Sequence, residues 1–433
     1  MLNKVLENLK IEALNAMQQA SIQAAQDKDV VLLSPTGSGK TLAFLLPVLQ
    51  RLSEKATGVQ ALVLVPSREL AMQIEQVFRQ MGTGFKVLSS YGGHPTYIEK
   101  NSLVEPPALL VGTPGRIAYH LRHHTIDPSP IHTLVLDEFD KALELGFQND
   151  MAYIIGQLTG VRKRILTSAT RMDTIPDFTG IQNPAELDFL GESTSKPDLT
   201  LKAIRAESTE KPETLYSLLC ALVSGATLVF CNHREAVERI SELLWNRGLE
   251  HGVFHGGMEQ PDRERALLKF RNGSHRVLLT TDLASRGLDI PEIEHIIHYQ
   301  LPPTEEAFTH RNGRTARMHA KGTAYLLLTD DEVPAYLSQP LDYLQLPERD
   351  ELPEPTDWST LYVGAGKKDK INKVDIVGLL LQKGNLQKEE LGRIEVQDHA
   401  AYAAVKRNKI KEVVQLIRSE KIKGKRIKME ISR

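Results

Sequence analysis

The stretch DVVLLSPTGSGKTLAFLLPVLQ, residues 29–50, decides the fold of the first part of this 433-residue chain. Its short run of valine and leucine predicts a buried strand, and the apolar segment that follows Lys40 predicts a helix. The loop between them contains Gly37 and Gly39. A strand, a glycine-rich loop and the start of a helix form the setting in which backbone N–H groups surround a phosphate. The stretch therefore predicts an α/β domain that binds a phosphate at residues 34–41.

The residue types in this loop favour a nucleotide ligand over a simple turn. Lys40 can reach the β- and γ-phosphates of ATP, and the Thr41 hydroxyl is placed to hold Mg²⁺. A glycine-rich turn without a ligand is the alternative, but such a turn does not call for lysine and threonine at these positions. The residues expected to contact ATP are Ser34, Pro35, Thr36, Gly37, Ser38, Gly39, Lys40 and Thr41.

A second apolar run ends in the segment VLDEFD, residues 135–140, which carries three carboxylates. Carboxylates at the carboxyl end of a neighbouring parallel strand face the nucleotide crevice. We therefore expect Asp137 to hold Mg²⁺ and Glu138 to orient or deprotonate the attacking water. The cost of burying these acids would be offset by the divalent cation.

Short apolar runs alternate with helical patterns along most of the chain, which is typical of a parallel sheet covered by helices on both faces. A polar linker, residues 191–199, separates two such domains at residues 1–190 and 200–345. A proline- and acid-rich linker, residues 346–355, precedes residues 356–433, where the order of elements is β-α-β-β-α-β. The predicted fold class is α/β, with two tandem parallel-sheet domains and a small α+β C-terminal domain.

Charge is distributed unevenly along the chain. Residues 356–433 contain 18 lysines and arginines against 10 aspartates and glutamates, whereas the remainder contains 35 against 45. A basic tail on an acidic body is typical of a protein that binds a polyanion. The alternative is a charged surface that is only hydrated.

The sequence also bears on the location of the protein. Its two cysteines, Cys220 and Cys231, lie in or beside apolar stretches and form no disulfide framework, which favours the reducing cytoplasm. No run of about 18 apolar residues is present, so we expect no membrane span. We infer no obligate protein partner.

Nine short motifs resemble, in order and context, those of the DEAD-box RNA helicases. They are SPTGSGKT, PSRELA, GG, TPGR, DEFD and SAT in the first domain, and HGGMEQPDRERALLKFR, TDLASRGLDI and HRNGRTARMH in the second. The resemblance covers nearly the whole chain. It implies two RecA-like domains, hydrolysis of ATP with Mg²⁺, and RNA as the molecule that is unwound or remodelled.

The resemblance assigns further residues to the ATPase machinery. These are Gln18 for the adenine edge, Asp289 for the ribose, Asp140, Ser168 and Thr170 for coupling hydrolysis to domain closure, Arg314 and Arg317 as arginine fingers, and His310 as a link to the first domain. Arginine fingers neutralise the charge on the transferring phosphoryl group.

RNA contacts are implied in both domains. The residues are Ser67, Arg68, Gly93, Thr113 and Arg116 in the first domain, and Arg263 and Thr280 in the second. In the family these positions contact the RNA backbone. They should therefore fix the position of the RNA without reading its sequence.

Some positions depart from the family pattern. Phe139 stands where the motif usually has alanine, and a bulky ring there could alter how Asp140 couples to the SAT motif. Asn312 and Ala316 replace an aliphatic residue and a glycine, but the arginine spacing is intact. The aromatic residue that usually lies upstream of the adenine-reading glutamine would precede Met1, so we do not expect adenine stacking or a high nucleotide affinity.

The order of elements in residues 356–433 suggests a fold like the RNA recognition motif. Tyr362 lies where a first-strand aromatic residue would stack on a base, whereas Tyr402 suits the core as well as such a platform. The segments GKKDKI and EKIKGKRIKMEI resemble the C-terminal domain of the DbpA-type helicases, which implies a structured ligand, a hairpin of large-subunit ribosomal RNA. The basic residues expected to contact it are Lys367, Lys368, Lys423, Lys425 and Arg426.

Two other functions remain open at this point. The chain could be an RNA-binding scaffold or clamp that does not unwind, which the intact Lys40, Asp137 and Glu138 disfavour. It could also be a DNA helicase, which the motifs TPGR, RGLDI and HRNGRTAR disfavour. The histidines at residues 120–132 lack the spacing of a metal site and are expected to be a polar connection.

Overall fold

The computed structural model describes most of the chain, as two compact units. The described residues are 2–35, 37–93, 96–172, 174–191, 198–282, 293–315, 321–329, 334, 336–337, 340–347 and 351–432. The first unit lies within residues 2–191 and the second within residues 198–432. The first unit contains a seven-stranded sheet, and the second contains a seven-stranded and a four-stranded sheet with a short hairpin.

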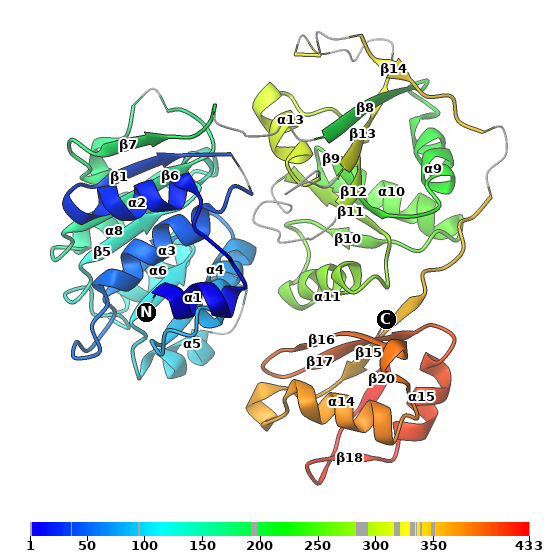
Figure 1. The fold of residues 1–433 in the computed structure, drawn as a ribbon. Coiled ribbons are helices and arrows are strands. Elements are labelled where there is room, and N and C mark those ends of the chain that lie inside the picture. The colour runs from blue at the N-terminus through cyan, green and yellow to red at the C-terminus, as the bar shows by residue number, and fades with distance from the viewer. Residues whose placement is uncertain are drawn as a thin grey trace. The chain divides into compact units, whose positions relative to one another are not determined.

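The first unit is built on a parallel sheet with the strand order β3-β4-β2-β5-β6-β1-β7; Figure 1 labels β5, β6, β1 and β7 of this sheet. The strands are β1 (Val30–Leu33), β2 (Ala61–Leu64), β3 (Val87–Ser90), β4 (Leu109–Gly112), β5 (Thr133–Leu136), β6 (Lys163–Ser168) and β7 (Ala185–Asp188). Val30 and Leu32 belong to one buried cluster and Val31 to another, because alternate residues of a strand point to opposite faces. Both faces are apolar, which explains the continuous runs of valine and leucine.

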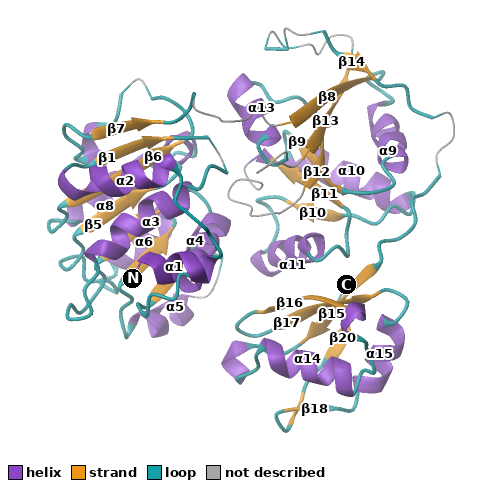
Figure 2. Ribbon diagram, in the orientation of Figure 1, coloured by secondary structure: helices purple, strands orange, loops and turns teal. Residues whose placement is uncertain are grey.

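Helices cover both faces of this sheet (Figure 2). They are α1 (Leu2–Leu9), α2 (Ala16–Asp27), α3 (Lys40–Arg51), α4 (Arg68–Gln80), α5 (Thr96–Leu103), α6 (Pro114–Arg122), α7 (Phe139–Glu144), α8 (Gln148–Gln157) and the 3-10 turn η1 (Asp177–Thr179). Helices α2, α3 and α4 contribute to the first buried cluster, and α6, α7 and α8 contribute to the second. The functional loops are thereby left at the carboxyl ends of the strands.

The larger sheet of the second unit repeats this plan, with the parallel order β10-β11-β9-β12-β13-β8-β14. Its strands are β8 (Asp198–Arg205), β9 (Ala226–Cys231), β10 (Gly252–Phe254), β11 (Val277–Thr281), β12 (Ile293–His298), β13 (Lys321–Leu328) and β14 (Asp342–Tyr343). Its helices are α9 (Lys211–Ala221), α10 (Arg234–Asn246), α11 (Gln260–Arg271) and α13 (Glu305–Asn312). Cys220 and Cys231 are buried here as free thiols. We call this part of the second unit its large domain.

The rest of the second unit is a small domain, residues 356–432, with the antiparallel sheet β16-β17-β15-β20. Its elements are β15 (Trp358–Val363), η2 (Lys367–Asp369), α14 (Lys373–Gln382), η3 (Lys388–Glu390), β16 (Leu391–Val396), β17 (Ala401–Lys406), α15 (Ile410–Ile417), β18 (Lys421–Ile422), β19 (Lys425–Arg426) and β20 (Met429–Ile431). Both helices pack on one face of the sheet (Figure 2). The predicted fold class, two tandem parallel-sheet domains and a small α+β domain, is confirmed. In the part of the chain that the structure describes, no helix is long and apolar enough to cross a membrane.

Candidate active site and nucleic-acid interface

Two glycines shape the phosphate-binding loop between β1 and α3. Gly37 and Gly39 have φ angles of 83° and 93°, in the left-handed region that glycine tolerates best. A Cβ at position 39 would lie 2.7 Å from Nε2 of Gln18, so a side chain there would displace the Gln18 amide. Left-handed residues of this kind turn successive N–H groups toward one anion. Thr36, which was expected to contact ATP, lies outside the described residues.

Lys40 is held across the loop that precedes it. Its ammonium group donates to the carbonyl oxygens of Ser34 (2.5 Å) and Pro35 (3.1 Å), and the Ser34 hydroxyl donates to that of Ser38 (2.6 Å). An ammonium group in this position can exchange carbonyl oxygens for phosphate oxygens without leaving the loop. Thr41 follows in the first turn of α3.

Asn15 and Gln18 fasten α2 to this loop. The side chain of each accepts a hydrogen bond from the backbone N–H of the other, at 2.9 and 3.0 Å, which forms a capping box. The Asn15 amide also donates to the Ser38 carbonyl (3.1 Å), and the Gln18 amide donates to the Gly39 carbonyl (3.3 Å). Gln18 therefore lies beside the phosphate-binding loop, and its reading of adenine stays a prediction.

Asp137 and Glu138 follow β5 at the edge of the sheet where β1 also ends. The Asp137 carboxylate is buried and accepts a hydrogen bond from the Thr167 hydroxyl. Burial and the adjacent Glu138 raise the pKa of Asp137 to about 6 from the ordinary 3.8, against the opposing effects of Thr167 and Lys40. Glu138 has a φ of 48°, a costly conformation for a residue with a side chain. Its N–H donates to the Thr167 hydroxyl (3.2 Å), which stabilises this turn.

The donors at this edge fit a hard divalent cation. A buried carboxylate whose pKa is raised by a second carboxylate is relieved by a cation with two charges. Mg²⁺ prefers oxygen ligands and usually binds one or two protein groups together with water and phosphate. Asp137 and the Thr41 hydroxyl are therefore the residues that could hold it.

Replacing Asp137 by asparagine is expected to stabilise the first unit at pH 7 when Mg²⁺ and nucleotide are absent. The folded-state pKa of about 6 lies above the ordinary 3.8, so the charged form costs about 3 kcal/mol of folding free energy above pH 6. This cost disappears as the pH falls from 6 toward 4. Thermal unfolding followed by circular dichroism should therefore show a higher midpoint for the variant at pH 7, and a smaller difference at pH 5.

Asp127→Asn is the control for this measurement. Hydrogen bonds from the backbone and side chain of Ser129 hold the pKa of the exposed Asp127 below its ordinary value, so this second asparagine should not raise the midpoint. An unchanged or lower midpoint for Asp137→Asn at pH 7 would show that the buried carboxylate carries no such cost.

The DEFD and SAT motifs are joined by hydrogen bonds. The Thr170 hydroxyl donates to Oδ2 of Asp140 (2.8 Å), and the Ser168 hydroxyl donates to the Thr170 carbonyl (2.7 Å). Phe139 is fully buried and packs against Phe178, with ring centroids 6.2 Å apart. The bulky ring thus occupies the core and leaves the bond between Asp140 and Thr170 in place.

The first-unit residues expected to contact RNA follow three adjacent strands. Ser67 and Arg68 come after β2, Gly93 comes after β3, and Thr113 comes after β4. Parallel strands end at the same edge of a sheet, so these segments lie side by side. Ser67 and Thr113 are also the N-caps of α4 and α6. Two helix N-termini at this edge favour the binding of a phosphate.

The two arginines of this edge are held close to the turn after β3. A Cβ on Gly92 would lie 3.6 Å from Nη2 of Arg68, so the arginine reaches that turn. Arg116, in the first turn of α6, donates from Nε to the Glu99 carboxylate at 2.6 Å. The structure therefore groups Arg68, Gly93 and Arg116, while their contact with RNA stays a prediction.

Helix α13 of the second unit carries the first residues of the arginine-finger motif, His310 to Asn312. His310 lies 3.5 Å from the Glu306 carboxylate, one turn earlier, and Arg314 is buried just beyond the helix. Arg317 and Asp289 lie outside the described residues.

Arg311, which the sequence did not single out, anchors this helix. Its side chain is 1% exposed. It makes two hydrogen bonds to the Asp282 carboxylate, at 2.6 and 2.7 Å, and one each to Gln300 O (2.6 Å) and Asn232 Oδ1 (2.7 Å). The signal was its place beside His310 in the motif.

Asn312, a departure from the family pattern, is satisfied within the large domain. His298 on β12 is fully buried, and its Nε2 donates to Oδ1 of Asn312 at 3.0 Å. Burial lowers the pKa of His298 to about 3, so the ring is neutral and keeps its donor. The buried amide oxygen of Asn312 therefore accepts a hydrogen bond from a ring that can donate it.

Arg263 and Thr280, expected to contact RNA from the second unit, are both buried. The Arg263 guanidinium lies 5.0 Å from the ring centroid of Phe254 on β10. The Thr280 hydroxyl donates to the Thr281 carbonyl (3.2 Å). Their RNA contacts stay predictions.

The basic residues expected to contact RNA in the small domain come from two segments that meet. Lys367 and Lys368 lie in η2, and Lys423, Lys425 and Arg426 lie in the hairpin of β18 and β19; all five are exposed. The segments are joined because Lys423 donates to the Lys370 carbonyl (2.5 Å) and Lys425 lies 3.5 Å from the Asp369 carboxylate. They form one surface, which we call the basic surface.

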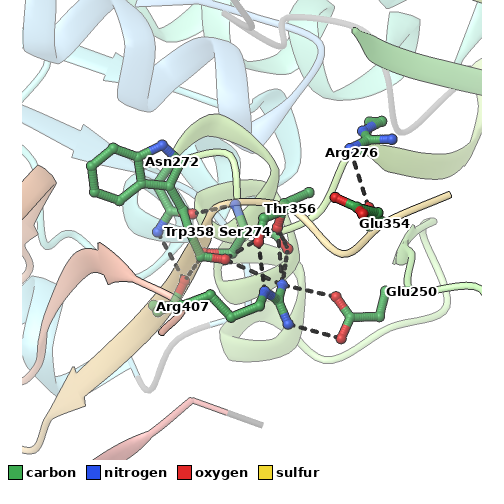
Figure 3. Close-up of polar contacts among 9 residues, drawn as sticks. Glu250, Asn272, Ser274, Arg276, Glu354, Thr356, Trp358 and Arg407 are labelled. Atoms are coloured by element: carbon green, nitrogen blue, oxygen red, sulfur yellow. Dashed lines mark hydrogen bonds and ion pairs between the residues drawn. The ribbon is translucent and has the colours of Figure 1, made fainter. Parts of the chain in front are cut away.

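The sheet face of the small domain that carries Thr360 borders the large domain, and Figure 3 shows polar contacts between the two domains. The Thr360 hydroxyl on β15 bonds the Asn272 amide (2.9 Å) and the Ser274 hydroxyl (2.8 Å), and all three side chains are buried. Arg407, just after β17, makes two hydrogen bonds to Glu250, at 3.0 and 2.9 Å. The two domains of the second unit are thus joined through polar groups.

Tyr362 and Tyr402 lie on this same face. They are paired across β15 and β17, with ring centroids 5.5 Å apart. Tyr402 is 9% exposed, and burial raises its pKa, with the nearby Arg265 of α11 opposing the rise. The stacking of Tyr362 on a base stays a prediction, on a face that the large domain borders.

Comparison with known proteins adds independent information. Residues 15–178 match the family described as DEAD/DEAH box helicase, residues 210–319 match the helicase conserved C-terminal domain, and residues 360–431 match the DbpA RNA binding domain. The chain is 30% identical to the ATP-dependent RNA helicase DbpA of Bacillus subtilis (strain 168) and 31% identical to that of Escherichia coli (strain K12). Each alignment covers 98% of this chain and 96% of the relative.

Solved structures support the same assignment. The structure of S. cerevisiae Dbp5 bound to RNA and ADP BeF3 is similar, with a TM-score of 0.69 and 26% identity, over 76% of this chain and 87% of that one. Three family matches in order and relatives that align over nearly their whole length leave one conclusion. The chain belongs to the DEAD-box ATP-dependent RNA helicases, in the DbpA group that carries a C-terminal RNA-binding domain.

Proposed function

We propose that this helicase opens or remodels a structured ribosomal RNA during assembly of the large ribosomal subunit. The observation that carries the proposal is the exposed basic surface of the small domain, which brings lysines from η2 and from the β18–β19 hairpin together. Structured RNA presents closely spaced phosphates to such a surface. The resemblance of both segments to the C-terminal domain of DbpA-type helicases supports a ribosomal RNA hairpin as the ligand.

In the proposed mechanism, different residues bind ATP, activate the attacking water and neutralise the phosphoryl group. Lys40 and the N–H groups of its loop bind the β- and γ-phosphates of ATP, and Asp137 and Thr41 would hold Mg²⁺. When bound, Mg²⁺ neutralises phosphate charge. Glu138 orients the attacking water and accepts its proton, and Arg314 and Arg317 neutralise the transferring phosphoryl group.

The RNA contacts proposed for the first unit are of another kind. Ser67, Arg68, Gly93, Thr113 and Arg116 bind sugar and phosphate at two helix N-termini, so this unit grips any RNA strand. The preference for one RNA therefore belongs to the basic surface.

We also place the protein in the cytoplasm, where the buried free thiols of the large domain remain reduced.

The test compares ATP turnover with three nucleic acids. A ribosomal RNA fragment that contains the large-subunit hairpin should stimulate turnover most, a generic RNA strand should stimulate it less, and the equivalent DNA should not. Equal stimulation by hairpin and generic RNA would remove the ribosomal target. Stimulation by DNA would favour a DNA helicase, and RNA binding without turnover would favour a scaffold.

Neutralising the basic surface should weaken binding of the hairpin RNA and flatten its salt dependence. Lys367→Ala, Lys368→Ala and Arg426→Ala remove three charges while sparing Lys423, which is ion-paired to Asp375 (2.8 Å). Each lost phosphate contact lowers the slope of log K against log salt by roughly one unit. Fluorescence anisotropy at several salt concentrations measures both effects.

The matched control removes three exposed lysines elsewhere on the small domain. Lys383, Lys388 and Lys411 lie outside the two segments of the basic surface. Their replacement by alanine changes net charge equally. If both triple variants lose the same affinity and slope, RNA binding responds only to total charge, and the basic surface is not the RNA reader.

A further inference from the structure

Glu99 on α5 lies behind the RNA-contacting edge of the first unit, in a buried cluster that no motif predicted. The residue is buried, with an exposed fraction of 7%. Oε2 accepts hydrogen bonds from Arg116 Nε (2.6 Å), His120 Nε2 (2.6 Å) and the Ser90 hydroxyl (3.2 Å). Oε1 accepts from the backbone N–H of Tyr91 (3.2 Å).

These contacts join the turn after β3 to the first turn of α6. Ser90 ends β3, Tyr91 opens the turn that contains Gly93, and Arg116 lies in the first turn of α6. Arg68 reaches the same turn from α4, within 3.6 Å of a Cβ built on Gly92. One carboxylate thus connects two of the three segments that form this edge, and the third lies against them.

We propose that Glu99 is a positioning residue for RNA binding, which fixes the direction of the Arg116 guanidinium and the conformation of the turn after β3. The proposal rests on the proposed RNA contacts of Arg116 and Gly93 and adds the residue through which they are arranged. Glu99 touches no RNA itself, because it is buried behind Arg116, whose side chain is 12% exposed. An arginine held in its binding direction loses less conformational freedom when a phosphate arrives.

The chemistry of the cluster explains why an acid is needed. Burial alone would raise the pKa of Glu99, but hydrogen bonds from His120 and Arg116 hold it below its ordinary value of 4.5. The carboxylate is therefore charged and accepts from four donors. His120 is fully buried, and its Nδ1 has no hydrogen-bond partner among the described residues. Because a carboxylate can only accept, Nε2 of His120 is the donor in its contact with Glu99.

The test measures RNA-stimulated ATP turnover by the full chain with Glu99→Ala, Arg116→Ala and both changes together. Glu99→Ala should raise KM for RNA about tenfold, as expected for losing hydrogen bonds to a charged group. Turnover at saturating RNA and KM for ATP should change less than about twofold, the pattern of a lost binding contribution. The double variant should lose less affinity than the two single variants combined, because both changes remove the fixed direction of the Arg116 guanidinium.

Two further variants separate positioning from folding. Glu99→Gln keeps an oxygen for Arg116 but turns a donor toward Tyr91 N, so its KM for RNA should lie between wild type and Glu99→Ala. Glu75→Ala is the control: this acid also binds a β3 hydroxyl, that of Ser89, and an arginine, Arg79, away from Arg116. It should leave KM for RNA unchanged.

Several results would overturn the proposal. An unchanged KM for RNA in Glu99→Ala, while Arg116→Ala raises it, leaves Glu99 without a role in binding. Additive losses in the double variant mean that Glu99 does not act through Arg116. A fall in turnover and in the thermal midpoint with no selective change in KM for RNA means a structural role only. If RNA fails to stimulate the wild type, the proposed function fails first, and this inference falls with it.

Discussion

Replacing Glu138 by glutamine is expected to reduce ATP turnover to background while ATP and RNA remain bound. Glutamine keeps the size of the side chain but cannot accept the proton of the attacking water, a loss of about 10²–10⁴-fold. The backbone bond from Glu138 N to Thr167 does not involve the side chain, so the turn should persist. Lys40 and Asp137, the groups proposed to bind phosphate and Mg²⁺, are unchanged.

Single-turnover ATP hydrolysis and RNA binding in the presence of ATP measure the two halves of this expectation. Glu144→Gln is the control, because Glu144 ends the helix α7 that follows Glu138, is 44% exposed and pairs with Lys141. It should leave turnover unchanged. Wild-type turnover by Glu138→Gln would remove water activation from this residue, and a joint loss of turnover and ATP binding would indicate local unfolding.

Arg314→Ala is expected to lower RNA-stimulated turnover by about 10³-fold or more, the effect of losing an arginine finger. ATP binding should stay nearly intact, because the phosphate-binding loop and Gln18 belong to the first unit. Arg317→Ala should behave in the same way. Turnover at saturating RNA and ATP, together with binding of a fluorescent ATP analogue, tests both variants.

Arg311→Ala is the comparison variant for this experiment, because Arg311 is expected to stabilise the fold and Arg314 to act in catalysis. Arg311 is buried and hydrogen-bonded to Asp282, Gln300 and Asn232, so its loss should lower the thermal midpoint of the second unit. Arg314 is buried as well, so turnover of Arg314→Ala should be measured below the midpoint of this variant, where a loss of turnover does not come from unfolding. If Arg314→Ala loses ATP binding and keeps its turnover rate, the finger assignment is wrong.

The sequence predicted the fold class and the family, because both depend on local patterns. Continuous valine and leucine runs report a sheet that is buried on both faces, and the glycine spacing of residues 34–41 reports a loop with left-handed residues. The order of strands, which brings residues after β2, β3 and β4 to one edge, follows from this fold. The roles of the site residues stay predictions, since proximity alone does not measure chemistry.

The contacts that sequence reasoning missed are long-range. Glu99 and Arg116 are seventeen positions apart, and Arg311 and Asp282 are twenty-nine apart. No spacing rule links them. The departures from the family pattern have the same explanation: Phe139 is accommodated by Phe178, and Asn312 by His298. Each substitution becomes understandable only when its partner in the folded chain is known.

The buried hydrogen bonds of Thr360 with Asn272 and Ser274 limit how this helicase can be divided or recombined. A chain cut before residue 356 would remove Thr360, so Asn272 and Ser274 would exchange this buried partner for water. Truncation would therefore change the surroundings of the C-terminal end of α11 as well as remove the basic surface. A graft of the small domain onto another helicase would need the acceptor to supply the equivalents of Asn272, Ser274 and Glu250. The unit that could be grafted is thus larger than residues 360–431, the part that matches the DbpA RNA binding domain.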